Sequence, residues 1–372
     1  MQNFYQNTTP PPAQNQPYPQ YRNYPPNPQY APYPPPAPVL TPQQQQKRSL
    51  RKASNGLGFF VLVYFLLMQV AAYLTSDLLV QFNAITSENR TSMLFLIQIL
   101  AGIASALIAA FFYKIISRRK LSSNLTNSRV PMNKLIPMVL LGMGAAMLAN
   151  QLAAMFDSNI SFFELKNSVS MTTSTHSVPE MILYVISTAF MPAFAEELAF
   201  RGIFMNVMRK YGDAFAIISS SVLFGAMHGN TTQIVFAFTL GLIFAFVDCK
   251  ANSIVPSIII HFLNNFYAVS TDMLSSGAGL DDGTVTIIRI SIISMICVIG
   301  ILSYIYLSQT DKDFFRITES DTKGIAEKSF LTLKQKLITC FTSVGVIISL
   351  SVFASEMILN LMPEDMLNHL FM

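Results

Sequence analysis

The sequence predicts an all-α fold, a polytopic membrane bundle of about eight to nine transmembrane helices, preceded by a disordered N-terminal tail. Three observations predict it. Hydrophobic residues make up 52% of the 372 positions and charged residues only 12%, whereas about 25% of an average soluble domain is charged. Apolar runs of about 20 residues, long enough to cross a bilayer, recur along most of the chain. Proline is concentrated in the first 46 residues, where such runs are absent.

The N-terminal segment, residues 1–46, holds 14 of the 20 Pro and six of the 14 Tyr, mixed with Gln and Asn. Such a segment has too few large apolar side chains to offset the entropy lost on ordering. We therefore predict a disordered cytoplasmic tail with local polyproline II character. A solvated extension is the simpler interpretation, and a docking segment for a partner that binds Pro-rich sequences is the alternative.

Residues 47–372 are predicted to form one membrane domain. It opens with a basic anchor, Lys47, Arg48, Arg51 and Lys52, directly before the first apolar run. Hydropathy then predicts nine apolar segments, of which 214–229 is short enough that it need not cross fully. In chain order these segments are 56–82, 92–116, 133–156, 180–207, 214–229, 231–248, 253–270, 285–308 and 336–362.

Lys and Arg gather on one side of this predicted domain. If the nine segments alternate in direction, the anchor and the basic positions after the second, fourth, sixth and eighth segments face the same side. Cytoplasmic loops carry the excess of Lys and Arg, so this side, with the N-terminus, is predicted to be cytoplasmic. The tail composition and the lack of a transit signal favour a bacterial cytoplasmic membrane. The basic positions are Arg118, Arg119, Lys120, Arg209, Lys210, Lys250 and the group from Lys312 to Lys336.

Charge and cysteine content exclude other classes. The formal net charge of +4 does not support nucleic-acid binding. The three Cys residues, Cys249, Cys297 and Cys340, lie far apart and form no C-x-x-C pair. A disulfide scaffold and a Cys-rich zinc site are therefore excluded.

The fourth apolar segment carries charges that membrane spans rarely hold. Glu196 and Glu197 are followed by Arg201, and each ionised residue at the bilayer centre costs about 2.5–3.5 kcal/mol on insertion scales. Glu197 and Arg201 are four positions apart on one helix face, where they can form an ion pair. Glu196 is turned about 100° away from Glu197, which leaves it free to face a cavity as a general base. Pro192 removes a helix hydrogen bond and is expected to kink the segment there.

A purely structural ion pair is the simpler interpretation of these charges. It explains Glu197 and Arg201, but it does not explain Glu196. Two histidines, His228 and His261, follow on later apolar segments, and Asn265 shares a helix face with His261, four positions before it. At 1.5 Å per helical residue, Glu197, His228 and His261 lie about 18, 22 and 17 Å from the nearest predicted cytoplasmic markers. We therefore expect the three groups to meet at a similar depth on three helices.

Three short motifs, in this order on successive apolar segments, resemble those of the CAAX protease and bacteriocin-processing family (CPBP, also called Abi) of intramembrane proteases. The Ras-converting CAAX endopeptidase is a relative of this family. The resemblance covers residues 180–270, about a quarter of the chain. The first motif alone is weak, but three motifs in order are a specific signal. They are Glu196-Glu197-x-x-x-Arg201, Phe224-x-x-x-His228 and His261-x-x-x-Asn265.

The resemblance implies an all-helical membrane fold that encloses a polar catalytic cavity, with a catalytic core at 180–270 that hydrolyses a peptide bond. It implies that Glu196 activates the attacking water and that His228 assists. His261 and Asn265 would stabilise the oxyanion or hold a metal, and the neighbouring ion pair would order the site. The expected partners are the lipid bilayer and a peptide or membrane-protein substrate, in CAAX-type maturation, bacteriocin processing, self-immunity or membrane-protein processing.

Zinc is a candidate cofactor that the sequence does not require. Glu196, His228 and His261 together could bind zinc and leave a position open for water, whereas the compact His-Glu-x-x-His motif is absent. Two other classes of function stay open. One is a non-catalytic scaffold of the same fold that recruits partners through its tail. The other is a proton-coupled transporter with Glu196 and His228 as a relay, which the lack of repeat symmetry disfavours.

Overall fold

We describe a computed structural model of the chain over residues 40–81, 89–117, 128–162, 177–277, 279–317 and 328–361. Residues 1–39 of the predicted tail lie outside the described residues, as do the basic positions 118–120. Helix α1 begins at Pro42. Residues 42–46, assigned to the tail from the sequence, are therefore helical.

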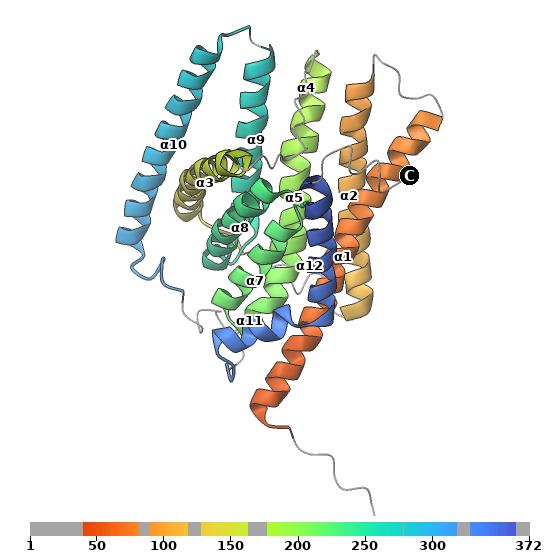
Figure 1. Cartoon of the computed structure of the whole chain (residues 1–372). Coiled ribbons are helices and arrows are strands. Elements are labelled where there is room, and N and C mark those ends of the chain that lie inside the picture. Colours follow the sequence, from red (N-terminus) through yellow and green to blue (C-terminus); the bar gives the residue numbers. More distant parts are fainter. Residues whose placement is uncertain are drawn as a thin grey trace, which may run out of the picture. The chain divides into compact units, whose positions relative to one another are not determined.

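The described residues form helices and no strand, so the predicted all-α fold is confirmed (Figure 1). Over its described residues, each of the nine predicted apolar segments is mostly helical. The last of them, 336–362, is divided between two helices, α11 and α12. The helices are α1 Pro42–Gln81, α2 Arg90–Ser117, α3 Met132–Phe162, α4 Val178–Val185, α5 Met191–Glu197, α6 Asn206–Met208, α7 Asp213–Ala226, α8 Thr231–Ala251, α9 Val255–Gly277, α10 Asp282–Thr310, α11 Leu333–Phe341 and α12 Val344–Leu361.

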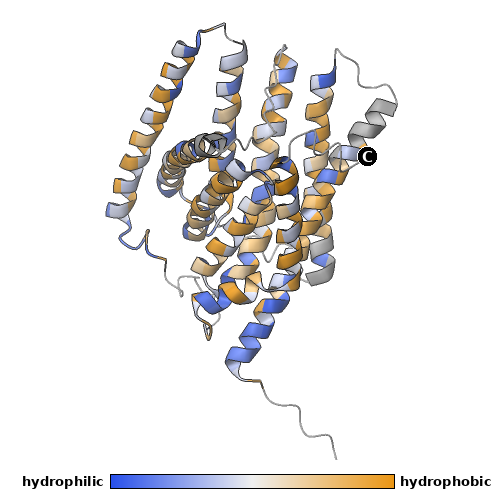
Figure 2. Cartoon of the chain, viewed as in Figure 1, coloured by the Kyte–Doolittle hydropathy of each residue, from blue (hydrophilic) through white to orange (hydrophobic). Residues whose placement is uncertain are grey.

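Within the described ranges, seven helices are long and apolar enough to cross a membrane, fewer than the eight to nine predicted. They are α1, α2, α3, the continuous helix Val178–Tyr211, α8, α10 and α12. Figure 2 shows their hydrophobic middles and the hydrophilic N-terminal turns of α1. Two predicted spans fall short. Helix α7 has only 14 residues, and α9 is interrupted by polar side chains such as His261 and Asn264. Both carry parts of the candidate site.

The helix Val178–Tyr211 is irregular in a way that the sequence did not predict. A capping box at Ser177 and Glu180 starts it, each side chain accepting the other's backbone N–H. It contains two π-helical stretches, Ile186–Phe190 (η2) and Leu198–Met205 (η3), which flank α5, and ends in a 3₁₀ turn, Arg209–Tyr211 (η4). Such π-helical turns occur frequently at functional sites.

Several helix ends that carry basic residues are bonded to one another. Arg209 donates to Asp213 at 2.8 Å and to Asn252 Oδ1 at 2.8 Å. Asn252 Nδ2 donates in turn to Ser128 Oγ before α3, at 3.1 Å. Lys250 Nζ donates to the Asp313 carbonyl after α10. The ends of η4, α8 and α10 therefore lie together at the N-terminal end of α3, which agrees with the alternation of the predicted segments.

Helices α1 and α12 cross at two glycines. A Cβ atom on Gly58 would overlap the backbone of Gly345 and Val346, and one on Gly345 would overlap the Asn55 carbonyl. Hydrogen bonds hold the crossing: Gly345 N–H donates to Asn55 Oδ1 at 3.1 Å, and Ser349 Oγ donates to Gly58 O at 2.8 Å. Small residues allow such close backbone approach between membrane helices.

We expect Gly58→Ala to lower the free energy of unfolding by about 1–3 kcal/mol, because the added methyl group forces the two backbones apart. Gly56→Ala, half a turn away, is the matched control, since a Cβ there meets nothing within 4 Å. The control should be neutral or slightly stabilising, because alanine favours a helix. Thermal unfolding in detergent, followed by circular dichroism, compares the two. Equal midpoints would contradict a close crossing at Gly58.

Candidate active site

The centre of the candidate site is a buried carboxylate, Glu197 at the end of α5. Its Oε1 accepts a hydrogen bond from Arg201 Nη1 at 2.9 Å and lies 2.9 Å from His261 Nδ1 on α9. The side chains of Glu197 and Arg201 are both 0% exposed. The ion pair expected from the i, i+4 spacing is present. The bond from Glu197 to His261 was not predicted from the sequence.

Two aromatic rings enclose the guanidinium of Arg201. Its Cζ lies 4.3 Å from the Phe224 ring centroid and 5.3 Å from that of Phe244, and Nη2 donates to the Gly241 carbonyl at 3.2 Å. His261 stacks on Phe244 with ring centroids 5.2 Å apart. Desolvated cation–π contacts are worth about 2 kcal/mol or more. The buried cation is thus stabilised by a carboxylate, a carbonyl and two ring faces.

Phe224 also connects this cluster to His228. The two rings meet edge to face at 5.1 Å, and Phe224 contacts His261 in the same way at 6.2 Å. His228 Nδ1 lies 2.8 Å from the Phe224 carbonyl oxygen. With Nδ1 donating there, Nε2 keeps a lone pair that can accept a hydrogen bond from water. Among the described residues, no hydrogen bond joins His228 to Glu196 or to His261.

Helix α12, which lies outside the predicted catalytic core, contacts the turn that carries His228. Gly229, the next residue, has a φ of +62°, and a Cβ there would lie 2.7 Å from Glu356 Cγ on α12. Asn360 Nδ2, also on α12, donates to the Gly229 carbonyl at 2.9 Å. These contacts were not predicted from the sequence. Glu356, an ionisable residue in an apolar span, was the signal that could have pointed to α12.

Glu196 has a different environment from its neighbour Glu197. It is half-buried and lines a cavity of about 380 Å³. Its carboxylate therefore faces a cavity, whereas that of Glu197 is enclosed in the ionic cluster. Helices α1 and α2 form part of the cavity wall, and the rest comes from the helix of Glu196 itself. The other lining residues are Tyr64, Met68, Gln69, Gln98, Ala101, Gly102, Ser187, Thr188, Met191, Pro192 and Ala195.

A series of hydrogen-bonded asparagine side chains ends at this cavity wall. Pro192 has no N–H to donate to Thr188 O, four residues earlier. Asn265 Nδ2 on α9 donates to that carbonyl at 3.2 Å. Asn264 Nδ2 donates to Asn265 Oδ1 at 3.3 Å, and Asn150 Nδ2 on α3 donates to Asn264 Oδ1 at 3.1 Å. Because Thr188 also lines the cavity, the Asn265 amide lies next to the space that Glu196 faces.

The structure thus divides the predicted site residues into two connected parts. Glu197, Arg201 and His261 form the buried ionic cluster, with His228 attached through Phe224. Glu196 lines the cavity, and Asn265 bonds to Thr188 in the cavity wall. In the part of the chain that the structure describes, no three His, Cys, Asp or Glu side chains lie close enough to hold a metal ion. His261 Nδ1 is engaged by Glu197. The described arrangement therefore does not fit a zinc site made of Glu196, His228 and His261.

Seven apolar spans and a buried ionic cluster define the class, an integral membrane protein with a polar internal site. Within the chain, residues 178–267 match the family model described as type II CAAX prenyl endopeptidase Rce1-like. The match begins at α4 and ends two residues after Asn265, so it contains all three sequence motifs and confirms the resemblance over this segment. No curated protein and no solved structure gives a significant match.

Proposed function

We propose that the protein is an intramembrane endopeptidase that hydrolyses a peptide bond with water activated by Glu196. One observation carries the proposal: of two adjacent glutamates, one is enclosed in a buried ionic cluster and the other faces a cavity. The match of this segment to an Rce1-like endopeptidase family supports peptide hydrolysis as the chemistry.

In the proposed reaction, the Glu196 carboxylate accepts a proton from a water molecule as the water oxygen attacks the peptide carbonyl carbon. His228 is proposed to assist, as the resemblance implies, with its Nε2 lone pair as a hydrogen-bond acceptor. The carbonyl oxygen becomes an oxyanion, to which the Asn265 amide donates with its remaining N–H. Glu196 then gives the proton to the leaving nitrogen as the C–N bond breaks. No step passes through zinc.

The buried ionic cluster positions these groups. Glu197 bonds to His261, and His261 precedes Asn265 by one helical turn on α9. Glu196 is adjacent to Glu197 on α5. The cluster therefore fixes the position of Asn265 along α9 relative to that of Glu196 along α5. A preorganised donor can stabilise the oxyanion without reorganising during the reaction.

Asn265→Ala is expected to lower kcat by about 10²–10³-fold, the usual cost of removing one oxyanion donor, with a small effect on KM. Asn264→Ala is the comparison, because it removes a bond to Asn265 Oδ1 but leaves the Nδ2 donor in place. We expect a far smaller loss of kcat for that variant. Steady-state kinetics on a substrate peptide measures both, and equal losses would indicate a structural role for the amide chain.

The substrate class is part of the proposal: a peptide or membrane protein, in CAAX-type maturation, bacteriocin processing, self-immunity or membrane-protein processing. We also propose that the N-terminus lies in the cytoplasm, from the one-sided Lys and Arg, and, from the tail composition, that the membrane is a bacterial cytoplasmic membrane. The test compares new peptide termini in membrane and secreted fractions of host cells that carry wild type or Glu196→Gln at matched expression. Asp282→Asn, at an exposed position, controls for the loss of one negative charge.

Termini that appear with wild type and Asp282→Asn but not with Glu196→Gln would support the protease and reveal its cleavage context. Identical termini in all three, with folded and abundant protein, would contradict it. The scaffold alternative predicts that deletion of residues 1–46 abolishes the phenotype while Glu196→Ala preserves it. The transporter alternative predicts proton flux in proteoliposomes that Glu196→Gln abolishes.

A further inference from the structure

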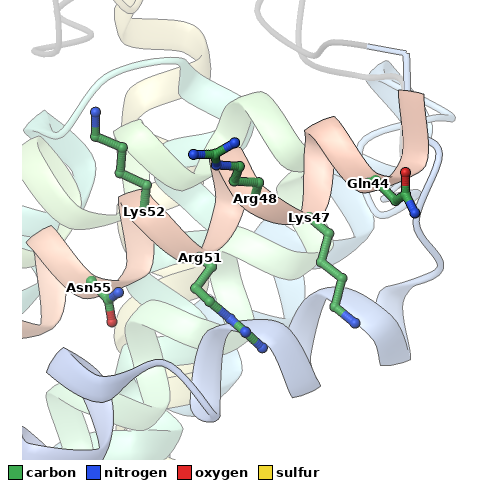
Figure 3. Close-up of a pocket in the computed structure, with 6 residues that line it drawn as sticks. All are labelled: Gln44, Lys47, Arg48, Arg51, Lys52 and Asn55. Carbon is green, nitrogen blue, oxygen red and sulfur yellow. The ribbon is translucent and has the colours of Figure 1, made fainter. Parts of the chain in front are cut away.

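The first turns of α1 carry four basic side chains around a pocket of about 450 Å³ (Figure 3). Arg48 and Lys52 project to one side of the helix, and Lys47 and Arg51 to the other. All four are exposed, and none of them forms an ion pair within the described ranges. Gln44 and Asn55 are further lining residues. The chain contains no Asp or Glu before Asp77, so no nearby acid on this helix neutralises the cluster.

The helix that presents these cations is fixed by its other face. Gln46 Nε2 donates to the Lys328 carbonyl at 3.2 Å, and its Oε1 accepts from Phe330 N–H at 2.8 Å. Ser49 Oγ and Tyr211 Oη lie 2.9 Å apart, and Leu50 is fully buried. The backbone that carries the four cations is therefore already ordered. A ligand that binds them does not have to order this segment, which lowers the entropic cost of binding.

The same helix continues into an apolar span whose surface is exposed. Phe59, Leu66 and Val70 are 41%, 43% and 50% exposed. Lys52 precedes Phe59 by seven residues, about 10 Å along the helix axis. The polar headgroup layer on each side of a bilayer is about 5–8 Å thick. With Phe59 placed at the edge of the hydrocarbon, the Lys52 backbone lies just outside the headgroup layer, and its long flexible side chain spans the remaining distance to the lipid phosphates. Arg48 lies about one helical turn further out.

We infer that this basic cluster is a binding site for the headgroup of an anionic phospholipid. The ligand chemistry is a phosphate oxyanion, to which Arg48 on one side of the helix, or Arg51 on the other, can donate two parallel N–H bonds. Lys47 and Lys52 add point charges at short range. Continuity with the exposed apolar face of α1 favours a phosphate that carries acyl chains over a free phosphate ion. The site is separate from the candidate active site and does not depend on the proposed protease activity.

The chain contains no Trp, so Phe59→Trp gives a single fluorescent reporter. Positions 48, 52 and 59 share one helix face. The full chain carrying this change is reconstituted in vesicles of 20% phosphatidylglycerol and 80% phosphatidylcholine, with one lipid brominated at a time. Quenching of the Trp measures the relative affinity of the two lipids at this face. We expect phosphatidylglycerol to be favoured by at least about fivefold, the contribution of a single basic residue at an anionic surface.

Arg48→Gln with Lys52→Gln should reduce that preference at least about fivefold, while circular dichroism stays unchanged because both side chains are exposed. The matched control, Lys312→Gln with Arg316→Gln, removes two exposed charges after α10 and should leave the preference intact. Equal quenching by both lipids, or an equal loss in the control, would overturn the inference. Loss of the preference on adding inorganic phosphate at constant ionic strength would assign the site to free phosphate and also overturn it.

Discussion

Glu196→Gln should lower kcat for a substrate peptide by about 10²–10⁴-fold, the range over which general acid–base groups contribute. Glutamine keeps the shape of the side chain but cannot accept a proton from water. Glu196 lines a cavity and is not part of the ion pairs around Glu197, so we expect the fold to be unaffected. Single-turnover kinetics of the purified protein, on a peptide that spans a cleavage site found in cells, measures the effect.

Glu197→Gln is the natural comparison, because it makes the same chemical change one residue later. It removes the charge that compensates Arg201 and the carboxylate that His261 contacts, so its main effect should be on stability. The two variants should therefore differ: Glu196→Gln should melt like wild type but have the lowered kcat, while Glu197→Gln should melt at a lower temperature. A folded Glu196→Gln variant with wild-type kcat would remove Glu196 from the mechanism.

Hydropathy predicted the apolar helices well and was least informative at the site itself. The long spans α3, α8 and α10 are apolar along most of their length, so composition alone identifies them. Helix α9 has polar side chains at the positions that face the candidate site, which lowers its average hydropathy. Helix α7 is too short to cross. The helices that build a polar site inside a membrane are the ones that depart most from a simple apolar pattern.

Local spacing predicted part of the site. The four-residue separation of Glu197 and Arg201 predicted the ion pair. The turn of about 100° between adjacent helix residues predicted that Glu196 has a separate environment. The π-helical turns η2 and η3 were not predicted, because they depend on hydrogen bonds that a single sequence does not reveal. Pro192 predicted a broken helix bond, but not that Asn265 would donate to the freed carbonyl from another helix.

Contacts between distant segments account for the rest. The sequence named Phe224 only as part of a motif, whereas its ring touches Arg201, His228 and His261. Phe244 was not named at all, since an aromatic residue in an apolar span carries no distinguishing signal. The hydrogen bond from Asn360 on α12 to the Gly229 carbonyl joins residues 131 positions apart. Such pairings follow from how the helices pack, and hydrophobic periodicity specifies which face is buried but not which residue it meets.

Arg201→Leu is expected to lower the free energy of unfolding by about 3–5 kcal/mol, the cost of leaving a buried charge without its partner. The charge left behind is the Glu197 carboxylate, which is 0% exposed. Arg201→Lys keeps the charge, but an ammonium group is not a planar fork that can bond Glu197 and Gly241 O while stacking on Phe224. We expect that variant to fold less well and to have reduced activity. The midpoint of thermal unfolding and the yield of monodisperse protein measure both.

The double variant Glu197→Gln with Arg201→Leu separates charge from packing. Replacing both members of a buried ion pair by neutral groups is often neutral or stabilising, whereas removing one leaves an uncompensated charge. If the unpaired carboxylate causes the loss in Arg201→Leu, the double variant should recover part of the stability although it has two substitutions. No recovery would mean that the guanidinium matters through its contacts with Phe224 and Phe244. Wild-type activity in Arg201→Lys would contradict the ordering role of the planar pair.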